Sequence, residues 1–552
     1  MSFPMSVFPK RQFNLLTSLC LFMIPCCAQL EPSRAAEPQE ISVVEQNQTQ
    51  NKSKTGTDTS QAIQQSRLAD RTPSSGPLFT PLSADESGID FVNPIDITHN
   101  RKRLYHSGFV CGGVAVGDLN GDGKPDLFLN SGPRPNCLYL QDDNLRFTDA
   151  TKAAGLNLKE FDWSTGVTMA DVNGDAHLDL LICNYDSPNR LYINDGKANF
   201  TEATDSGLEI ADASLASSFA DYDNDGDLDC FLLTNRFYRA GGRPVENPTE
   251  MINGVPVVLD KYKKYYFVTK ASGNHYNVEE YGRPDRLFRN NGDGTFEDVT
   301  QKSGISGNGH GLSSIWWDHD SDGLIDLYIC NDFNDPDYLW RNNGDGTFTN
   351  VIANSVPHSS WFSMGSDIAD VNNDGLLDLF TVDMSATNHF NQKTTMGVMN
   401  AKKIQEVAGP PQQTMRNSLL LNSGTGRFLE AAYLAGVADS DWSWSPKFAD
   451  YDCDGRVDLF ISNGMARNFT NSDLKFTEKD KVGKTAWEFY ENTPPKRDRN
   501  LAFQNVADLE FKDVSKAWGI DHLGMSYSTA LGDLDGDGDV ELIVANLDEP
   551  VM

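Results

Sequence analysis

One nine-residue pattern recurs seven times along the chain and carries most of the side chains that could do chemistry. Its first, third, fifth and ninth positions hold Asp, Asn or Glu, and its sixth position is glycine in every copy but one. Oxygen side chains at alternate positions around a tight glycine turn are the ligands that Ca²⁺ prefers. The pattern therefore predicts up to seven calcium sites, whose side-chain ligands are Asp118, Asn120, Asp122 and Asp126; Asp171, Asn173, Asp175 and Asp179; Asp221, Asp223, Asp225 and Asp229; Asp318, Asp320, Asp322 and Asp326; Asp370, Asn372, Asp374 and Asp378; Asp450, Asp452, Asp454 and Asp458; and Asp533, Asp535, Asp537 and Glu541.

Other uses of these acidic loops fit the sequence less well. An EF-hand needs a bidentate Glu at position 12, where these copies have only Leu, Ile, Thr or Val. A turn whose carboxylates merely cap backbone N–H groups is reasonable for one copy. Seven uncompensated carboxylate clusters would repel strongly, which favours a bound cation. Ala176 replaces the glycine of the second copy and is expected to take a left-handed conformation at a cost of about 1 kcal/mol.

The segments around each loop predict the strands that position it. In the second copy, short runs at 165–170, 180–184, 190–194 and 199–203 read as four strands, with the acidic loop between the first two. A tight Asn/Gly/Asp turn precedes the fourth strand and is typical of a hairpin. Seven such units predict an all-β fold, a seven-bladed β-propeller with the calcium loops between the first and second strands of each blade. Each unit also repeats one phenylalanine, namely Phe79, Phe147, Phe200, Phe296, Phe348, Phe428 and Phe511.

The chain divides into three parts by composition. Residues 1–28 combine two basic residues, an apolar run and a small-residue region, as in an export signal. The alternatives are a lipid anchor at Cys26 or Cys27 and retention of the segment as an uncleaved anchor. Residues 29–77 are polar and almost free of aromatic residues, which predicts a disordered linker. Residues 78–552 hold the repeats, and none of their apolar runs is long enough to cross a membrane.

Three units are expanded between their second and third strands, at about 238–283, 385–416 and 466–499. In an up-and-down blade this connection lies at the opposite end of the strands from the acidic loop. Each insertion has more basic than acidic residues, although the whole chain has a formal net charge of −33. The insertions are therefore expected to form either a binding surface or a cap packed over the central channel.

The net charge excludes one class of partner, because nucleic acid phosphates would be repelled. None of the cysteines forms a C-x-x-C pair, so a zinc or redox motif is not indicated. Cys183, Cys230 and Cys330 fall at similar points of three apolar runs and are expected to be buried.

The repeats resemble the FG-GAP/VCBS repeats of integrin-α-type propellers. Segments 330–348, 363–367 and 459–464 are also similar to the cartilage-acidic-protein-like, ASPIC/UnbV-associated family. The resemblance implies an exported protein that is secreted or lies in the periplasm or at the cell surface. It also implies calcium-loaded blades and a role in adhesion or extracellular binding. The resemblance further implies a C-terminal ASPIC/UnbV domain, which we do not expect within the sequence to Met552. From the repeat pattern, the seventh unit is expected to lack its third strand and to take its fourth strand from the Phe79 segment.

Two functions remain open at this point. The first is a calcium-stabilised extracellular module that binds a protein or a glycan, because the recurring polar groups are all metal loops. The second is a polysaccharide lyase or glycoside hydrolase, which would need acid and base groups in the insertions. The candidates for that role are His275, Tyr276, Tyr281, Arg283, His389, Lys402 and Lys403. Nothing in their spacing marks a catalytic set, so no catalytic residue is predicted.

Overall fold

The described part of the chain begins just before the repeats. The computed structural model describes residues 76–552, except 108–111, 157–161, 271–274, 334, 396–410, 475–479, 481 and 508. The chain separates into Met1–Arg67 and Leu68–Met552, and every described residue belongs to the second part. The predicted export signal, with Cys26 and Cys27, and nearly all of the predicted linker therefore lie outside the described residues.

Six units of four antiparallel strands follow one another along the chain, each paired in the predicted order. The apolar runs that enter and leave each acidic loop form the first two strands of its unit. The units are β1 (Val114–Gly117), β2 (Asp126–Leu129), β3 (Cys137–Gln141) and β4 (Phe147–Asp149); β5 (Ser164–Ala170), β6 (Asp179–Pro188), β7 (Arg190–Asn194) and β8 (Phe200–Ala203); β9 (Ala211–Ala220), β10 (Asp229–Thr234), β15 (Arg286–Asn290) and β16 (Phe296–Asp298); β17 (His310–Trp317), β18 (Asp326–Asp332), β19 (Tyr338–Asn342) and β20 (Phe348–Asn350); β22 (Gly365–Ala369), β23 (Asp378–Val382), β25 (Ser418–Asn422) and β26 (Phe428–Glu430); and β27 (Ser443–Ala449), β28 (Asp458–Asn463), β30 (Leu501–Ala507) and β31 (Glu510–Asp513). The far end of β6 also pairs with β9. The predicted all-β class is confirmed.

The seventh acidic loop lies in a sheet of two strands, β33 (Ser526–Gly532) and β34 (Glu541–Asn546). Met552 then exchanges two backbone hydrogen bonds with Val544, with N to O distances of 2.7 and 3.0 Å. In the second unit Arg190, the first residue of the third strand, lies opposite Ile182 in the same way. Met552 thus lies where the third strand of another unit begins, but among the described residues this unit has two strands and, as predicted, no third strand.

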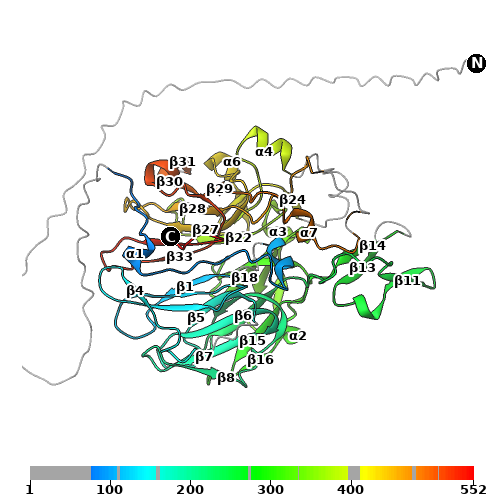
Figure 1. The fold of residues 1–552 in the computed structure, drawn as a ribbon, viewed down its shortest axis with the longest axis horizontal. Helices are drawn as coiled ribbons and strands as arrows, with labels where there is room; N and C mark the ends of the chain where they lie inside the picture. Colours follow the sequence, from blue (N-terminus) through cyan, green and yellow to red (C-terminus); the bar gives the residue numbers. More distant parts are fainter. Residues whose placement is uncertain are drawn as a thin grey trace, which may run out of the picture. The chain divides into compact units, whose positions relative to one another are not determined.

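The first strands of the units contact one another in a closed circuit. β1 contacts β5, and contacts continue through β9, β17, β22, β27 and β33 back to β1; Figure 1 shows the red strand β33 beside the blue strand β1. The Phe79 N–H donates to the Trp518 carbonyl (2.8 Å), as the Phe200 N–H donates to the Ala154 carbonyl (2.8 Å). Phe79 therefore takes the place of the repeated phenylalanine beside the seventh unit, although no strand forms around it. This closed order is that of a β-propeller-like module.

The remaining elements are short and lie between or after the units. The two-stranded pieces are β11 (Thr249–Ile252) with β12 (Val255–Val258), β13 (Tyr266–Lys270) with β14 (Tyr276–Glu280), β21 (His358–Ser360) with β24 (Gln412–Thr414), and β29 (Asp498–Arg499) with β32 (Leu523–Gly524). The helices are α1 (Ala84–Ser87), α2 (Thr300–Ser303), α3 (Ile352–Ser355), α4 (His389–Thr394), α6 (Ala432–Ala435), α7 (Ala486–Tyr490) and α8 (Ser515–Trp518), with 3₁₀ turns η1 (Lys102–His106) and η3 (Asp260–Tyr262). Among the described residues, no helix is long and apolar enough to cross a membrane.

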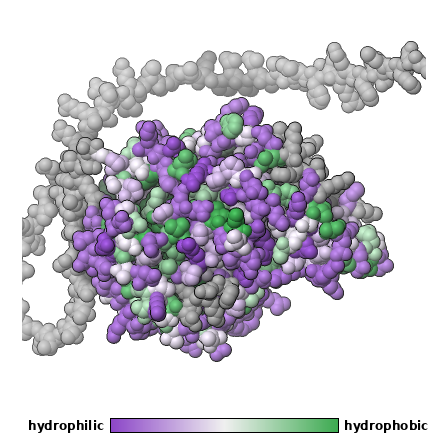
Figure 2. Space-filling view, viewed as in Figure 1, coloured by the Kyte–Doolittle hydropathy of each residue, from purple (hydrophilic) through white to green (hydrophobic). Residues whose placement is uncertain are grey.

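Alternating strand residues build the core between neighbouring units. Cys183, Cys230 and Cys330 are all fully buried, as predicted, and burial raises the pKa of the Cys183 thiol to about 12. Hydrophilic residues cover most of the face seen in Figure 2, with hydrophobic residues in small separate patches. Exposed apolar side chains also occur on the hairpin of β11 and β12, at Met251 and Ile252.

Candidate functional site

Each acidic loop is held in shape by the carboxylate at its first position. In the first loop Asp118 accepts the backbone N–H groups of Gly121, Asp122 and Gly123, at 2.8, 3.2 and 2.8 Å. The N–H of the sixth position donates to the first-position carboxylate in all seven loops. This hydrogen bond requires a backbone turn at the sixth position, and Ala176 takes that turn with φ +68°. The predicted left-handed conformation of Ala176 is confirmed.

The ninth-position acid ties each loop to its sheet. In the first unit Asp126 is fully buried, and its two oxygens accept the N–H groups of Leu119 and Gln141, both at 2.9 Å. The N–H of the second position donates to this acid in all seven loops. Burial raises the pKa of Asp126 to about 6 and that of Asp229 to about 7, although the backbone N–H groups act in the opposite direction. These acids hold the strands together whether or not they also bind a cation.

Four loops bring three or more carboxylates together, with oxygens within 4.8 Å of one another. The groups are Asp221, Asp223 and Asp225; Asp318, Asp320 and Asp322; Asp450, Asp452 and Asp458; and Asp535, Asp537, Asp539 and Glu541. The last group includes the side chain of Asp539, at position 7, which is not among the predicted ligands. In the loops at Asp118, Asp171 and Asp370, the third-position Asn instead donates its side-chain amide to the fifth-position Asp, at 3.3, 3.0 and 2.9 Å.

Two of these carboxylates have an oxygen that no described group satisfies. Asp320 Oδ1 and Asp452 Oδ1 are buried in their loops without a hydrogen-bond partner. Burial, followed by the neighbouring loop acids, raises the pKa of Asp452, and burial also raises that of Asp320. A buried carboxylate oxygen without a donor is costly, and a hard cation would satisfy it. The donor set therefore fits Ca²⁺.

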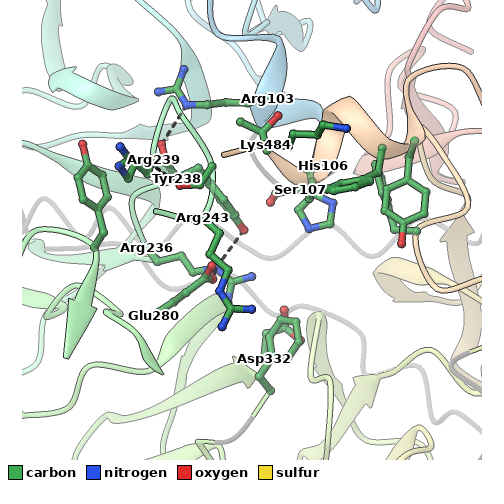
Figure 3. Close-up of a pocket in the computed structure, with 18 of the residues that line it drawn as sticks. Arg103, His106, Ser107, Arg236, Tyr238, Arg239, Arg243, Glu280, Asp332 and Lys484 are labelled. Carbon is green, nitrogen blue, oxygen red and sulfur yellow. Dashed lines mark hydrogen bonds and ion pairs between the residues drawn. The ribbon is translucent and has the colours of Figure 1, made fainter. Parts of the chain in front are cut away.

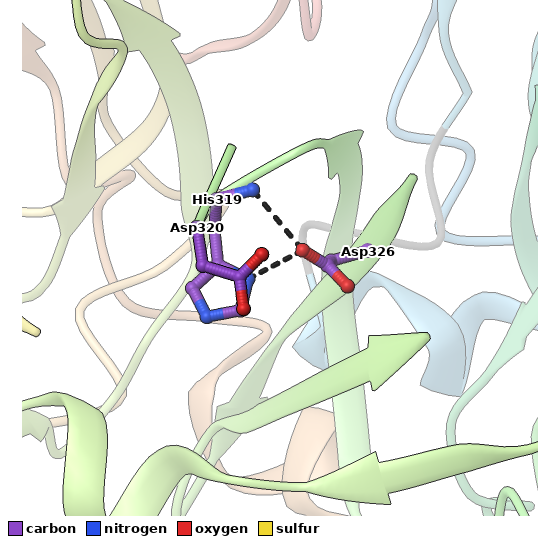
Figure 4. A group of neighbouring side chains, drawn as sticks. All are labelled: His319, Asp320 and Asp326. Carbon is purple, nitrogen blue, oxygen red and sulfur yellow. Dashed lines mark hydrogen bonds and ion pairs between the residues drawn. The ribbon is translucent and has the colours of Figure 1, made fainter. Parts of the chain in front are cut away.

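The fourth loop contains a histidine that the pattern did not reveal as a candidate. His319 occupies the second position, is 1% exposed, and pairs through Nδ1 with Asp326 (Figure 4). Its ring stacks on Phe428, with centroids 6.2 Å apart and planes at 17°. The sequence did not mark His319 as a candidate, because the second position of the loop varies between copies. The Phe428 ring that stacks on His319 also comes from the next unit, so the contact is not visible in the local sequence.

The three insertions meet one another at the other end of the strands. The Gly483 N–H donates to the Arg243 carbonyl (2.7 Å), and the Ser472 N–H donates to the Thr394 carbonyl (2.7 Å). These contacts join the third insertion to the first and to the second. We call the described residues of 238–283, 385–416 and 466–499, together with η1, the cap.

The turn η1 joins the cap from a part of the chain where no cap segment was predicted. The ring of Tyr105 lies 5.3 Å from that of Trp487, and Lys102 Nζ lies 3.1 Å from Glu491. Tyr105 and Trp487 are both fully buried. The segment from Phe79 to the first acidic loop is longer than the corresponding segment of the other units, and η1 within it completes the cap.

A cavity of about 1190 Å³ remains beneath the cap. Its walls come from η1, from the residues after β10, from β14, from the end of β18 and from α7, as Figure 3 shows. β18 runs from Asp326 in an acidic loop to Asp332 in the cavity wall. At about 3.3 Å per residue this separates the cavity from the loop by about 20 Å. The acidic loops and the cavity therefore lie at opposite ends of the strands, as predicted for the loops and the insertions.

Basic side chains from different elements surround the cavity. Arg103, Arg236, Arg239, Arg243 and Lys484 border it, against the carboxylates of Glu246, Glu280 and Asp332. Apolar groups from the fifth and sixth units complete the wall, among them Met384, Trp444 and Met465. In a chain with a net charge of −33 the cavity is thus locally basic. Arg239 and Arg243 fall within the predicted basic insertion, whereas nothing in the sequence pointed to Arg103 or Arg236.

Arg236 is the fixed charge of the cavity wall. Its side chain is 9% exposed, and Nε lies 3.1 Å from Glu280 and donates to Tyr238 Oη at 3.1 Å. Burial acts to lower the pKa of Arg236, but Tyr238, Glu280 and Asp332 outweigh it and raise the pKa. Burial raises the pKa of Asp332 to about 7, against the effect of Arg236. The Arg236 guanidinium is thus charged and held in place.

Two histidines beside Arg236 are neutral. Burial, followed by the charge of Arg236, lowers the pKa of His106 to about 3 and that of His310 well below its ordinary value. His310 Nδ1 lies 2.9 Å from the Arg236 guanidinium, so it accepts a hydrogen bond from it. Neither histidine adds positive charge at neutral pH.

The residues considered for catalysis do not converge on this cavity. His275, Tyr276, Tyr281, Arg283 and His389 lie in the described part of the chain, and none of them lines it. Arg283 instead pairs with Asp212, at 2.7 and 3.1 Å. Lys402 and Lys403 lie outside the described residues.

Comparison with known proteins identifies the repeat. The model of the FG-GAP-like repeat matches residues 118–182, 171–232, 318–381 and 406–461. The chain contains FG-GAP-like repeats. Each match ends at position 12 of an acidic loop, in the second strand of a unit, so the FG-GAP-like repeats and the structural units follow the same pattern.

Relatives support the resemblance to the cartilage-acidic-protein family. The chain is 24% identical to cartilage acidic protein 1 of Mus musculus and of Homo sapiens over 265 residues, which are 46% of this chain and 34% of each relative. It is 26% identical to the Xenopus tropicalis protein over 147 residues, 25% of this chain and 23% of that one. The chain thus spans about a third or less of the relatives' length.

Likeness to solved structures is weaker. The structure of BBS1N in complex with ARL6DN has a TM-score of 0.37 and 9% identity, covering 80% of this chain and 91% of that one. The rhamnogalacturonan lyase YesW has a TM-score of 0.33 and 12% identity, covering 79% and 70%. Neither likeness carries an argument about function.

Proposed function

We propose that this protein is a secreted or cell-surface, calcium-stabilised β-propeller that acts as an extracellular binding or adhesion module for a protein or a glycan. The observation that carries the proposal is the cavity beneath the cap, at the end of the strands opposite the acidic loops. Binding sites are commonly concave and are built from loops on a rigid scaffold. The name of the relatives, cartilage acidic protein 1, supports an extracellular location.

In this proposal calcium acts on stability. The acidic side chains at positions 1, 3 and 5 of the loops, with the position-9 acids, would hold the ions, and the unpartnered oxygens of Asp320 and Asp452 support this role. When bound, the ion supplies positive charge that offsets repulsion among the loop carboxylates. The closed circle of four-stranded units then keeps the cap elements at fixed positions around the cavity.

Thermal unfolding tests the role of calcium. We expect chelation to lower the Tm by many degrees, because each site filled at 100 times its Kd contributes about 2.7 kcal/mol. Asp320→Ala should reduce the calcium-dependent rise in Tm. Asp345→Ala, which removes an exposed acid that caps Thr347 in the turn after β19, should leave that rise unchanged.

Two results would contradict the proposal. An unchanged Tm after chelation would remove the calcium role. Failure to retain any extracellular protein or glycan through residues that line the cavity would remove the binding role.

A further inference from the structure

The cavity beneath the cap combines features that select one class of ligand. Its volume of about 1190 Å³ exceeds the range of about 300–1000 Å³ that is usual for small-molecule sites. Its cations come from separate segments of the chain, with Arg103 on η1, Arg243 in the first insertion and Lys484 in the third. The ligand must therefore be extended enough to meet charges on several sides.

The cations are suited to carboxylates. The guanidinium of an arginine presents a planar fork of donors that matches a carboxylate. Arg236 forms an ion pair with Glu280 and a hydrogen bond with Tyr238, so it is a fixed positive charge in the cavity wall. Arg243 and Lys484 are exposed at the rim, where their backbones are hydrogen-bonded to each other (3.3 Å). Figure 3 shows the side chain of Arg243 reaching toward the space beside Glu280 and Asp332.

The acids and rings of the same cavity limit what can carry those carboxylates. Glu280 and Asp332 would repel a ligand with closely spaced negative charges, but they can accept hydrogen bonds from hydroxyl groups. Aromatic side chains, among them Tyr265, Tyr266 and Phe489, offer flat apolar surfaces. A chain of sugar rings presents hydroxyl groups at its edges and apolar C–H groups on its faces. An acidic peptide has few hydroxyl groups to offer.

The acids in the cavity wall set the charge density of the ligand. Glu246, Glu280 and Asp332 lie among the cations and repel closely spaced negative charges, whereas the acidic loops, about 20 Å away, are screened over the Debye length of about 8 Å in physiological salt. A densely sulfated chain would meet this repulsion wherever it passes one of the three acids. A chain with one carboxylate for every two sugars would place a charge at the cavity cations and neutral rings elsewhere.

We propose that the cavity beneath the cap binds a carboxylated oligosaccharide of low charge density, through Arg243 and Lys484 at its rim and the fixed charge of Arg236 in its wall. This inference rests on the proposed binding function and names its ligand class. The cap thus acts as the recognition surface, and the acidic loops keep the scaffold beneath it in shape.

Direct binding measurements with a hyaluronan octasaccharide test the inference on the calcium-loaded protein. We expect saturable binding that weakens at least tenfold when the carboxylates of the octasaccharide are converted to methyl esters. The double variant Arg243→Gln/Lys484→Gln should also bind at least tenfold more weakly, with an unchanged Tm. The matched variant Lys302→Gln/Arg427→Gln removes the same charge from exposed residues outside the cavity and should bind as the wild type does.

The alternative outcomes are separable. Equal binding of the methyl ester, tighter binding of a heparin octasaccharide, or equal binding of a hexaglutamate peptide would overturn the ligand class. The same holds if the two double variants lose affinity equally, because a general charge effect would then explain the loss. If a protein or a neutral glycan binds and Arg243→Gln/Lys484→Gln abolishes that binding, the binding module stands and only the acidic saccharide falls.

Discussion

Asp285 tests how strongly burial of a carboxyl group affects the stability of the propeller-like module. It is 7% exposed at the entrance to β15, and its Oδ1 accepts both the N–H and the Oγ1–H of Thr234, at 2.7 and 3.2 Å. Burial raises its pKa to about 7, although the Thr234 hydrogen bonds act in the opposite direction. The folded protein therefore holds a proton on Asp285 that the unfolded chain releases near pH 4.

The sign of the effect follows from this order of pKa values. Ionisation of Asp285 opposes folding, so its cost is absent below pH 4, grows between pH 4 and 7, and is complete above pH 7. A difference of about 3 pKa units corresponds to about 4 kcal/mol. Asn at this position keeps both Thr234 hydrogen bonds on its carbonyl oxygen and carries no charge. Its amide N–H group costs about 1 kcal/mol if it finds no acceptor.

We therefore expect the Asp285→Asn variant to cross the wild type in stability as the pH changes. At pH 8 the variant should be more stable by about 2–3 kcal/mol, and at pH 4 it should be less stable by about 1 kcal/mol. Thermal unfolding at saturating calcium, from pH 4 to pH 8, measures the difference as a change in Tm. Comparison at each pH cancels the titration of the acidic loops, which both proteins share.

A second buried acid supplies the control. Asp212 is 3% exposed but pairs with Arg283, so Asp212→Asn breaks an ion pair and should lower stability by about 3 kcal/mol at pH 8, where Asp285→Asn should raise it. Parallel curves for Asp285→Asn and the wild type, or a loss of stability by Asp285→Asn at pH 8, would refute the reasoning.

Two further predictions concern a loop and the cap. Ala176→Gly should change the Tm by less than about 1 °C, because relief of about 1 kcal/mol of left-handed strain is offset by the greater freedom of glycine in the unfolded chain. Gly226→Ala, at φ +98°, should lower the Tm, and equal effects of the two changes would contradict the strain argument. Trp487→Ala should remove about 3–5 kcal/mol of cap stability by emptying the fully buried site beside Tyr105. Limited proteolysis of the variant should then cleave the segment 466–499 earlier than it cleaves the four-stranded units. Cleavage of the cap and of the units at the same rate would count against a separate cap.

The repeated local pattern made the units predictable. Period-two strands, an acidic turn with glycine and a hairpin turn each depend on residues close together in the chain. The first two strands of the second unit were therefore predicted within a few residues, at 165–170 and 180–184 against Ser164–Ala170 and Asp179–Pro188. The conformation of Ala176 was predicted for the same reason, since the turn around it repeats in six other copies.

The acidic loops show where this local reasoning stops. The sequence predicted Asp126 and its equivalents only as calcium ligands. Nothing in the local sequence indicated that an acid at position 9 also accepts a hydrogen bond from a backbone N–H group of the third strand. In the folded chain that N–H group comes from Gln141, fifteen residues away. Similarly, His319 gained a role only when Phe428, from the following unit, packed against its ring.

The sequence by itself determined the repeating unit, the position of the acidic loops and the end of the strands at which the insertions emerge. Only the tertiary structure decided that the insertions join into a cap, that η1 completes it, and that Arg236, Arg243 and Lys484 border one cavity. The physical reason is distance along the chain. Arg243 and Lys484 are brought together by closure of the ring and by backbone hydrogen bonds between two insertions, neither of which leaves a periodic mark in the residues themselves.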